Sequence, residues 1–141
     1  MCIRDSPHTR LRRKMMDLAA ASKGRENVSS PREMMMLLGA IYRGKLLNKE
    51  SAADFFKVLS TNKASWIPRD LPADLKIANK PGELEAVRND SGIVFVEGRP
   101  YIICVMTSFL RNEREGEEAV SYTHLDVYKR QVAITRFWIC V

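Results

Sequence analysis

A single cysteine in the interior of the chain is the first residue whose chemistry must be considered. Cys104 lies inside the apolar run Tyr101–Thr107, where a thiolate would be a nucleophile. Apolar surroundings, however, favour the neutral thiol, which neither attacks substrates nor binds metals. We therefore expect Cys104 to be a buried core residue. Cys2 lies in a segment that we interpret as sequencing read-through, and Cys140 lies in a segment that we leave unassigned. We therefore expect no disulfide framework and no metal site.

Four basic residues close together, Arg10, Arg12, Arg13 and Lys14, could contact the phosphates of a nucleic acid. The whole chain is basic, with 23 Lys and Arg against 17 Asp and Glu and a net charge of +6. A solvated helix face explains such a cluster equally well, and no nucleic-acid-binding motif accompanies it. We therefore expect no nucleic-acid partner. No apolar run is long enough to span a bilayer.

Two segments of the chain can be translated from one nucleotide word, AGATGTGTATAAGAGACAG. Read from its first ATG, the word gives residues 1–5 and the start of Ser6, and read one base earlier it gives residues 126–131. Its reverse complement gives residues 120–124 and the start of Leu125. Selection on a folded protein has no reason to produce this repeat, which resembles the transposon end used to fragment DNA for sequencing. We predict that residues 1–6 and 120–131 are sequencing read-through, that residues 7–119 are a natural segment interrupted at both ends, and that residues 132–141 remain unassigned.

Helical periodicity dominates the first half of the chain. Apolar residues from Leu11 to Leu18 recur at spacings of three and four, which predicts a helix over residues 9–22 that stops at Gly24. A second helix starts at an N-cap, a proline and a capping-box carboxylate and carries one apolar stripe before it ends at Gly44. Its starting residues are Ser30, Pro31 and Glu33, and its stripe is Met34, Leu37, Leu38 and Ile41.

A third helix is predicted over residues 49–60, with Asn48 as its N-cap and a buried face formed by Phe55, Phe56 and Leu59. Because few residues join it to the second helix, the two are expected to be antiparallel neighbours. Prolines 68 and 72 then predict turns around Trp66 and Ile67.

From Leu75 the periodicity becomes that of strands. Alternation from Leu75 to Asn79 predicts a strand that runs into Pro81 and Gly82. The apolar runs 93–96 and 101–107 flank a turn at residues 97–100, which predicts an antiparallel hairpin whose second strand is covered on both faces. The highly charged residues after Asn112 predict the start of a terminal helix, which the junction at residue 120 is expected to cut off. Helices followed by a three-strand antiparallel meander make the predicted fold class α+β.

Four segments stand in a distinctive order: SSPREM (residues 29–34), YRGKLL (42–47), NKPG (79–82) and RND (88–90), followed by the strand pair. This order resembles the C-terminal part of the class A beta-lactamase family of serine hydrolases, which is related to penicillin-binding proteins. The resemblance covers nearly all of residues 9–118. It implies the C-terminal portion of a beta-lactamase-like fold, truncated at both ends.

The resemblance assigns roles on one strand, where the family carries Lys-Thr/Ser-Gly. It makes Lys80 the catalytic lysine whose charge attracts the substrate carboxylate, and it makes Gly82 the residue that leaves room for substrate. The backbone N–H of Glu83 would donate to the oxyanion hole. Pro81 departs from the family because it has neither a hydroxyl nor an N–H, so one substrate contact is lost and the strand must be an edge there.

Other family residues have no counterpart in this chain. Ser60-Thr61-Asn62-Lys63 has the bare spacing of the nucleophile motif Ser-x-x-Lys but follows the third helix, which is the wrong place in the fold order. The Ser-Asp-Asn loop is absent, and residues 12–16, where the family has its deacylating glutamate, contain none. Arg88 and Asp90 could either hold the loop between two strands or point toward substrate.

The resemblance implies a parent enzyme that attacks a beta-lactam or a peptidoglycan-like amide through an acyl-enzyme, without a cofactor. Its partner would be a small-molecule or peptide substrate, and its location periplasmic or extracellular. We expect this chain to be inactive because it lacks the nucleophile. The alternative is a non-catalytic interaction module that binds a partner through the strands and the basic first helix. The sequence indicates no oligomeric state.

Overall fold

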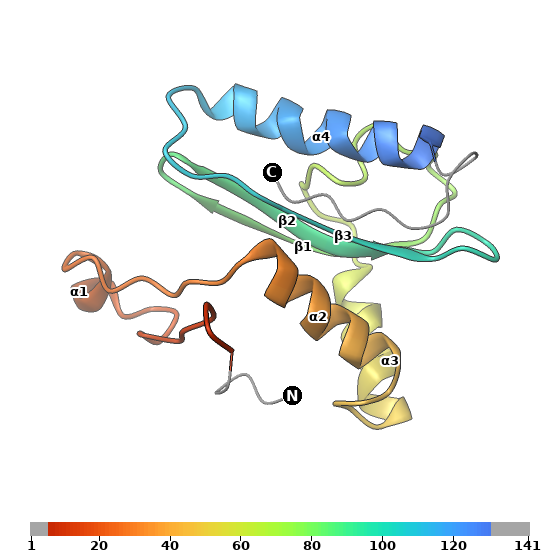
Figure 1. The fold of residues 1–141 in the computed structure, drawn as a ribbon, viewed down its shortest axis with the longest axis horizontal. Helices are drawn as coiled ribbons and strands as arrows, with labels where there is room; N and C mark the ends of the chain where they lie inside the picture. Colours follow the sequence, from red (N-terminus) through yellow and green to blue (C-terminus); the bar gives the residue numbers. More distant parts are fainter. Residues whose placement is uncertain (1–5, 131–141) are drawn as a thin grey trace.

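The computed structural model describes the backbone of residues 6–130 and the side chains of residues 6–122. Its centre is an antiparallel sheet of β1 (Ile77–Leu84), β2 (Val87–Val94) and β3 (Tyr101–Met106), in the order β1-β2-β3. Helices α2 (Pro31–Tyr42) and α3 (Lys49–Leu59) lie on one face, and α4 (Glu113–Arg130) covers the other (Figure 1). The predicted α+β class is confirmed.

The first helix is much shorter than its apolar spacing predicted. Within the predicted range 9–22, only α1 (Leu18–Ala21) is helical. Leu11 and Met15 are 78% and 76% exposed, so the predicted stripe packs against nothing in the described part of the chain. Because short helices are stabilised mainly by such packing, the periodic pattern alone did not suffice. The predicted helix over residues 9–22 is therefore wrong for most of its length.

Hydrogen bonds across a loop replace the missing helical turns. Arg10 and Val28 form an isolated antiparallel bridge. The side-chain oxygen of Asn27 accepts hydrogen bonds from the backbone N–H groups of Arg12 and Arg13, at 2.8 and 3.0 Å. A side-chain amide thus takes the donors that a helix would have used.

Helix α2 begins as predicted. The Ser30 hydroxyl accepts a hydrogen bond from the Glu33 N–H at 3.3 Å, and Pro31 is the first helical residue. The Glu33 carboxylate has a role other than the predicted capping box. It accepts hydrogen bonds from His8 N (3.1 Å) and from Thr9 Oγ1 (2.5 Å). Glu33 therefore fastens the N-terminal segment to the start of α2.

Helix α3 also confirms its prediction. Asn48 Oδ1 accepts a hydrogen bond from Ser51 N at 2.8 Å. Phe55 and Phe56 pack, partly buried, against the core, and the ring centroids of Phe56 and Phe95 are 6.0 Å apart in an edge-to-face arrangement. Both helices thus contribute to one cluster beneath the sheet.

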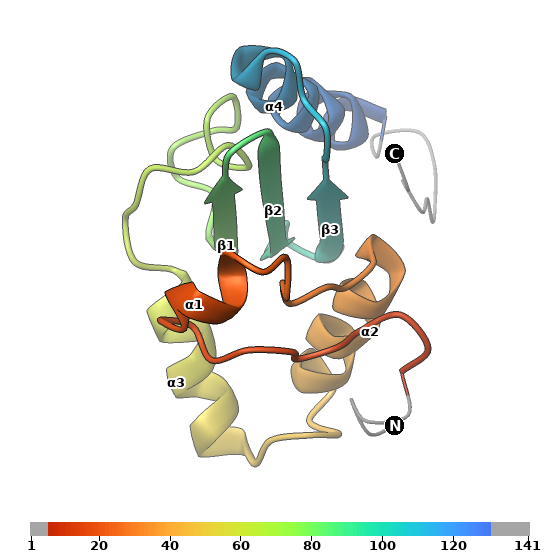
Figure 2. The ribbon, with the colours of Figure 1, turned by 90° about the vertical axis from the view of Figure 1, so that its left-hand side faces the viewer.

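The segment after α3 passes around the outer edge of β1, from the face of α3 to the face of α4 (Figure 2). The turns predicted at Pro68 and Pro72 are present. Ile67 is 1% exposed and Leu71 is 9% exposed, and both belong to the core beneath α4. This segment therefore fills the space between the sheet and the terminal helix.

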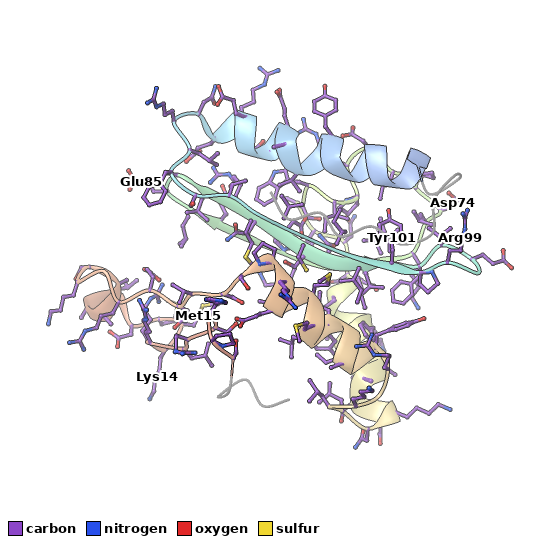
Figure 3. All side chains as sticks on the ribbon, in the orientation of Figure 1. Lys14, Met15, Asp74, Glu85, Arg99 and Tyr101 are labelled. Atoms are coloured by element: carbon purple, nitrogen blue, oxygen red, sulfur yellow. The ribbon has the colours of Figure 1, made fainter. Side chains whose placement is uncertain are left out.

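The first two strands are longer than predicted. β1 continues through Pro81 and Gly82 to Leu84, and β2 begins at Val87 instead of at residue 93. Pro81 is tolerated because β1 is an edge strand, as its missing N–H required. The turn between the strands places Glu85 at one end of the sheet, while Arg99 and Tyr101 lie at the opposite end (Figure 3). The predicted third strand and the turn before it are confirmed.

Two apolar clusters fill the two faces of the sheet. The cluster on the α4 face contains Ile67, Leu71, Val94, Ile103, Val105 and Val120. The cluster on the other face contains Leu38, Ile93 and Cys104, with partly buried residues from α2 and α3 around them. β3 contributes to both clusters, which confirms that it is covered on both faces.

The contacts of Glu33 make the attachment of the N-terminal segment dependent on pH. Burial tends to raise the pKa of Glu33, but hydrogen bonds from Ser6, Thr9 and His8 outweigh it and lower the pKa from 4.5 to about 2. Its stabilising effect is therefore complete above the unfolded pKa of 4.5 and is lost as the pH falls toward 2. We predict that Glu33→Gln lowers the urea midpoint near neutral pH, and that this deficit shrinks as both proteins are acidified. A deficit that stays constant down to the lowest pH would contradict this role.

Candidate functional site

Lys80 lies in the middle of the edge strand, on the same face of the sheet as α2 and α3. It pairs with Ser91, and Ser91 pairs with Cys104, which packs against Leu38 of α2. Because paired residues of antiparallel strands point to the same face, this register places the Lys80 side chain there. It is exposed, and its Nζ donates a hydrogen bond to the carbonyl of Pro81 at 2.7 Å.

The residues after Lys80 leave space beside the strand. A Cβ atom at Gly82 would meet only the side chain of Asn89, whose Cβ and Nδ2 would lie 3.6 and 4.0 Å away, which are ordinary contacts. The side chain of Glu83 is 66% exposed and lies 3.2 Å from Arg88 Nη2. Lys80, Gly82 and Glu83 thus follow one another along β1, with the side chains of Lys80 and Glu83 exposed.

Asp90 is a buried carboxylate that joins three parts of the chain. It is fully buried on β2 as the register partner of Pro81. Its Oδ2 accepts hydrogen bonds from Trp66 N (3.1 Å) and Ile67 N (3.0 Å), and the Asn79 amide donates to both of its oxygens at 2.9 and 3.0 Å. Burial raises the pKa of Asp90, and the hydrogen bonds from Ile67, Asn79 and Trp66 oppose that rise.

Arg88 is the second buried charge of β2. Its side chain is 4% exposed, and Nη2 lies 3.2 Å from Glu83 and 2.5 Å from Glu113, while Nε lies 3.5 Å from Glu117. Its Nη1 also donates to the carbonyls of Leu84 and Val87, both at 2.9 Å. Arg88 therefore binds the β1–β2 turn to the start of α4.

These contacts decide between the two roles that the sequence left open for Arg88 and Asp90. Both side chains are buried and directed at neighbouring elements, so they hold the structure together instead of facing a substrate. Both lie within β2 and not in a loop. The sequence analysis did not predict Asn79 as a partner of Asp90. The hairpin turn at residues 85–86 sets the register of β1 and β2, and this register places the two side chains on the same face of the sheet.

The bare Ser-x-x-Lys spacing does not form a nucleophile and base. Ser60 is the C-cap of α3, and its buried hydroxyl has no hydrogen-bond partner among the described residues. Lys63 Nζ donates instead to the carbonyls of Leu59 (2.5 Å) and Thr61 (2.8 Å). The expectation that this serine lies in the wrong place is confirmed.

Cys104 is buried at 4% exposure, and burial raises its pKa to about 11, although a hydrogen bond with Ser91 opposes the rise. The thiol is therefore protonated near neutral pH, which confirms its place in the core and not in catalysis.

Two residues of the basic cluster near the N-terminus, Arg10 and Arg13, hold the loop in which they lie. Arg13 is 10% exposed and pairs with Glu26 at 2.7 Å. Arg10 donates hydrogen bonds to the carbonyls of Ser6 and Thr9. Lys14 and Met15 lie in the loop below the sheet (Figure 3). The predicted basic first helix, which the alternative interaction module would use to bind a partner, is therefore not present at these residues.

An exposed edge-strand lysine followed by proline and glycine, on a sheet flanked by helices, agrees with the class of protein that the sequence resembles. The profile of the beta-lactamase enzyme family, Beta-lactamase2, matches residues 4–131. The chain therefore belongs to the beta-lactamase enzyme family. No curated protein matches it.

Several solved structures share the fold. A beta-lactamase from Chitinophaga pinensis is 26% identical, with a TM-score of 0.77, and the match covers 89% of this chain and 50% of that one. A beta-lactamase from Sphaerobacter thermophilus is 24% identical, with a TM-score of 0.76 and coverages of 95% and 51%. PBP-A is 23% identical, with a TM-score of 0.77 and coverages of 89% and 46%. The chain thus spans about half the length of the solved proteins that it matches.

Within residues 6–130, no helix is both long and apolar enough to cross a bilayer.

Two glycines of the β1–β2 pair, Gly92 and Gly82, are expected to differ in how much stability is lost when each is replaced by alanine. A Cβ atom at Gly92 would lie 2.6 Å from Asn79 Cβ and 2.7 Å from the Ala78 carbonyl, so strand backbone would have to move. We predict that Gly92→Ala lowers the free energy of unfolding by about 3 kcal/mol, whereas Gly82→Ala changes it by less than about 1 kcal/mol. Urea unfolding followed by circular dichroism measures both. Equal effects of the two substitutions would contradict this account.

Arg88 and Arg114 provide a matched pair of arginines that contact glutamate. We predict that Arg88→Met lowers the free energy of unfolding by about 2–4 kcal/mol, because it leaves three glutamates around a site without a cation. Arg114 is 82% exposed and pairs with Glu118 at 2.8 Å, so Arg114→Met should cost less than about 0.5 kcal/mol. Urea unfolding in low salt compares them. A loss below 1 kcal/mol for Arg88→Met would rule out the clamp between β2 and α4.

Proposed function

We propose that residues 7–119 belong to a serine hydrolase that attacks the amide bond of a beta-lactam or a peptidoglycan-like peptide through an acyl-enzyme. The observation that carries this proposal is the exposed Lys80 on the edge strand of a chain that belongs to the beta-lactamase family. An ammonium at an open strand edge can attract the carboxylate of an extended substrate. A mutant of PBP-A has been solved as an acyl-enzyme complex with penicillin G, which supports the same class of chemistry here.

Each residue of this stretch has one task in the proposal. Lys80 supplies positive charge for the substrate carboxylate. Gly82 leaves the space in which substrate lies along β1, since only Asn89 approaches a Cβ placed there. The backbone N–H of Glu83 donates to the oxygen on which charge develops when the carbonyl is attacked.

Pro81 removes one possible substrate contact from this stretch of β1. The residue between lysine and glycine has no hydroxyl to donate to the carboxylate, so substrate binding is weaker by one hydrogen bond. This disfavours efficient hydrolysis of beta-lactams. Residues 12–16 have no glutamate to activate a deacylating water, which favours a parent that holds its acyl-enzyme for longer, as a penicillin-binding protein does.

The chain on its own is proposed to be inactive. Covalent turnover needs a serine in contact with a base, and Ser60 has no such contact within the described residues. The parent enzyme would act on a small-molecule or peptide substrate in the periplasm or outside the cell, as the family resemblance implies.

A chromogenic cephalosporin such as nitrocefin tests the inactivity of this chain. We predict no hydrolysis above the buffer rate by the purified chain, and no difference between the chain and its Lys80→Ala variant. Turnover that Lys80→Ala abolishes would overturn the proposal that the chain lacks a nucleophile.

The DNA upstream of Pro7 in the original sample tests the parent activity. The hydrolase requires Ser-x-x-Lys and then Ser-Asp-Asn in the same open frame, ahead of residue 7. Degenerate motifs at both places would overturn the hydrolase and leave a non-catalytic module with the same fold.

A further inference from the structure

The two edges of the sheet differ in how well they are protected against pairing with another strand. β1 forms one edge and β3 the other. An edge strand presents unpaired backbone N–H and C=O groups, and natural proteins protect such edges with prolines and charged side chains, lysine above all. β1 carries Lys80, Pro81 and Glu83. β3 has the sequence YIICVM, which contains neither a proline nor a charged residue. Of the two edges, only that of β3 lacks this protection.

The hydrogen bonds of the sheet show which backbone groups of β3 point away from it. Thr107 N donates to the Arg88 carbonyl at 3.1 Å, one step beyond the last pair of the β2–β3 register. In an antiparallel pair, successive residues alternate between bonding to the neighbouring strand and pointing away from it. The backbone N–H and C=O groups of Ile102, Cys104 and Met106 therefore point outward.

The same alternation explains why the opposite edge is blocked. Phe95 N donates to the Lys76 carbonyl at 2.9 Å, so the backbone groups of the even-numbered residues of β1 face β2 and those of the odd-numbered residues point outward. Pro81 therefore occupies a position where the N–H of any other residue would point outward. A strand added to β1 would find no donor in the middle of the edge.

The faces of β3 are filled, so its edge is the part left to pair. Ile103 and Val105 belong to the cluster beneath α4, and Cys104 belongs to the cluster on the α2 face. Figure 2 shows β3 at the margin of the sheet, with α4 above it, α2 below it and no described helix or strand beyond it in the plane of the sheet. A row of alternating N–H and C=O groups is matched by the backbone of another extended strand.

Two exposed side chains of opposite charge flank β3 and favour an antiparallel partner. Glu97 lies in the turn before the strand and Arg111 in the loop after it. Neither takes part in an ion pair with the side chains that the structure describes. When a second copy of β3 lies antiparallel, the start of each strand is beside the end of the other. Glu97 of one copy and Arg111 of the other then lie at the same end, twice over, whereas a parallel copy would bring like charges together.

We propose that the outer edge of β3 is a pairing site for a second copy of this chain, which joins the two sheets into one through an antiparallel β3–β3 pair. The register that uses every outward backbone group pairs Cys104 with Cys104 of the second copy and Ile102 with Met106, and each pair exchanges both of its N–H···O hydrogen bonds. The contact is two-fold symmetric and therefore closed. Because Pro81 blocks the far edges, the assembly ends at a dimer. This pairing does not depend on the proposed function.

Sedimentation equilibrium of the full chain over a concentration series tests the dimer. We expect a reversible monomer–dimer equilibrium, with a dimer of twice 16.1 kDa. Met106→Pro removes an outward N–H and keeps the hydrogen bonds to β2, as Pro81 does on β1. It should raise the dissociation constant at least about tenfold, because the symmetry removes this donor from both copies. Met106→Ala is the matched control, which shortens the same side chain but keeps the N–H, and it should stay within about threefold of the original chain.

Charge reversal tests the antiparallel arrangement without altering the strand. Arg111→Glu should raise the dissociation constant by about 3- to 10-fold, because it replaces two attractions with two repulsions. Adding Glu97→Arg to the same chain should restore dimerisation to within about threefold of the original. A folded double variant that dimerises as weakly as Arg111→Glu alone would overturn the antiparallel pairing.

Amide hydrogen exchange of the original chain locates the interface and needs no variant. The amides of Ile102, Cys104 and Met106 should exchange more slowly as the protein concentration rises, whereas the outward amide of Glu83 on β1 should not change. A chain that stays monomeric at every concentration, or a dimer that a folded Met106→Pro variant forms equally well, would overturn the proposal. Protection of Glu83 instead of the β3 amides, or growth beyond the dimer, would overturn it as well.

Discussion

The burial of one carboxylate, that of Asp90, is the constraint on which the arrangement of this chain depends. A buried charge is tolerated only when hydrogen bonds replace the water that it loses. Trp66, Ile67 and Asn79 supply these hydrogen bonds, and they come from the segment after α3 and from β1. Because Asp90 can be buried only when both are in place, the core residue Ile67 and the edge strand are positioned by the same group.

Arg88, two residues earlier on the same strand, is also a buried charged residue held by contacts with neighbouring elements, and its charge is opposite. The two side chains do not neutralise each other. Asp90 receives hydrogen bonds from the segment that precedes the sheet and from β1, whereas Arg88 contacts β1 and the helix that follows the sheet. β2 thus holds both the segment that precedes the sheet and the helix that follows it, through two charged residues that have separate partners. Removing Arg88 leaves its glutamates without a cation, and removing the donors around Asp90 leaves a buried carboxyl group without hydrogen bonds. Either loss is far more costly than the loss of a surface pair.

Local signals in the sequence were reliable, and signals that required distant partners were not. The caps at Ser30 and Asn48, the turn after residue 96 and the third strand were all predicted, because each depends on neighbouring residues. The helix over residues 9–22 failed because periodicity does not reveal whether a partner surface exists. The lengths of β1 and β2 were underestimated because charged residues such as Arg88 and Asp90 disfavour a buried strand unless partners for them are known. The roles of Lys80, Gly82 and Glu83 come from the family resemblance, and they remain predictions, as does the origin of residues 1–6 and 120–131.

The clamp around Arg88 also sets the rotation of α4 about its axis. Glu113 and Glu117 contact Arg88, and Gly116 sits so close that a Cβ there would lie 3.3 Å from Arg88 Cβ. Residues three and four positions apart share one face of a helix, so position 120 points inward whatever residue it holds. Val120 is fully buried there, although we predict that it was translated from a transposon end. The contacts of the first two turns of α4 with the sheet therefore determine which later positions of the helix face the core. A sequence that was not selected for this fold can then complete the core if it has a small apolar residue at position 120.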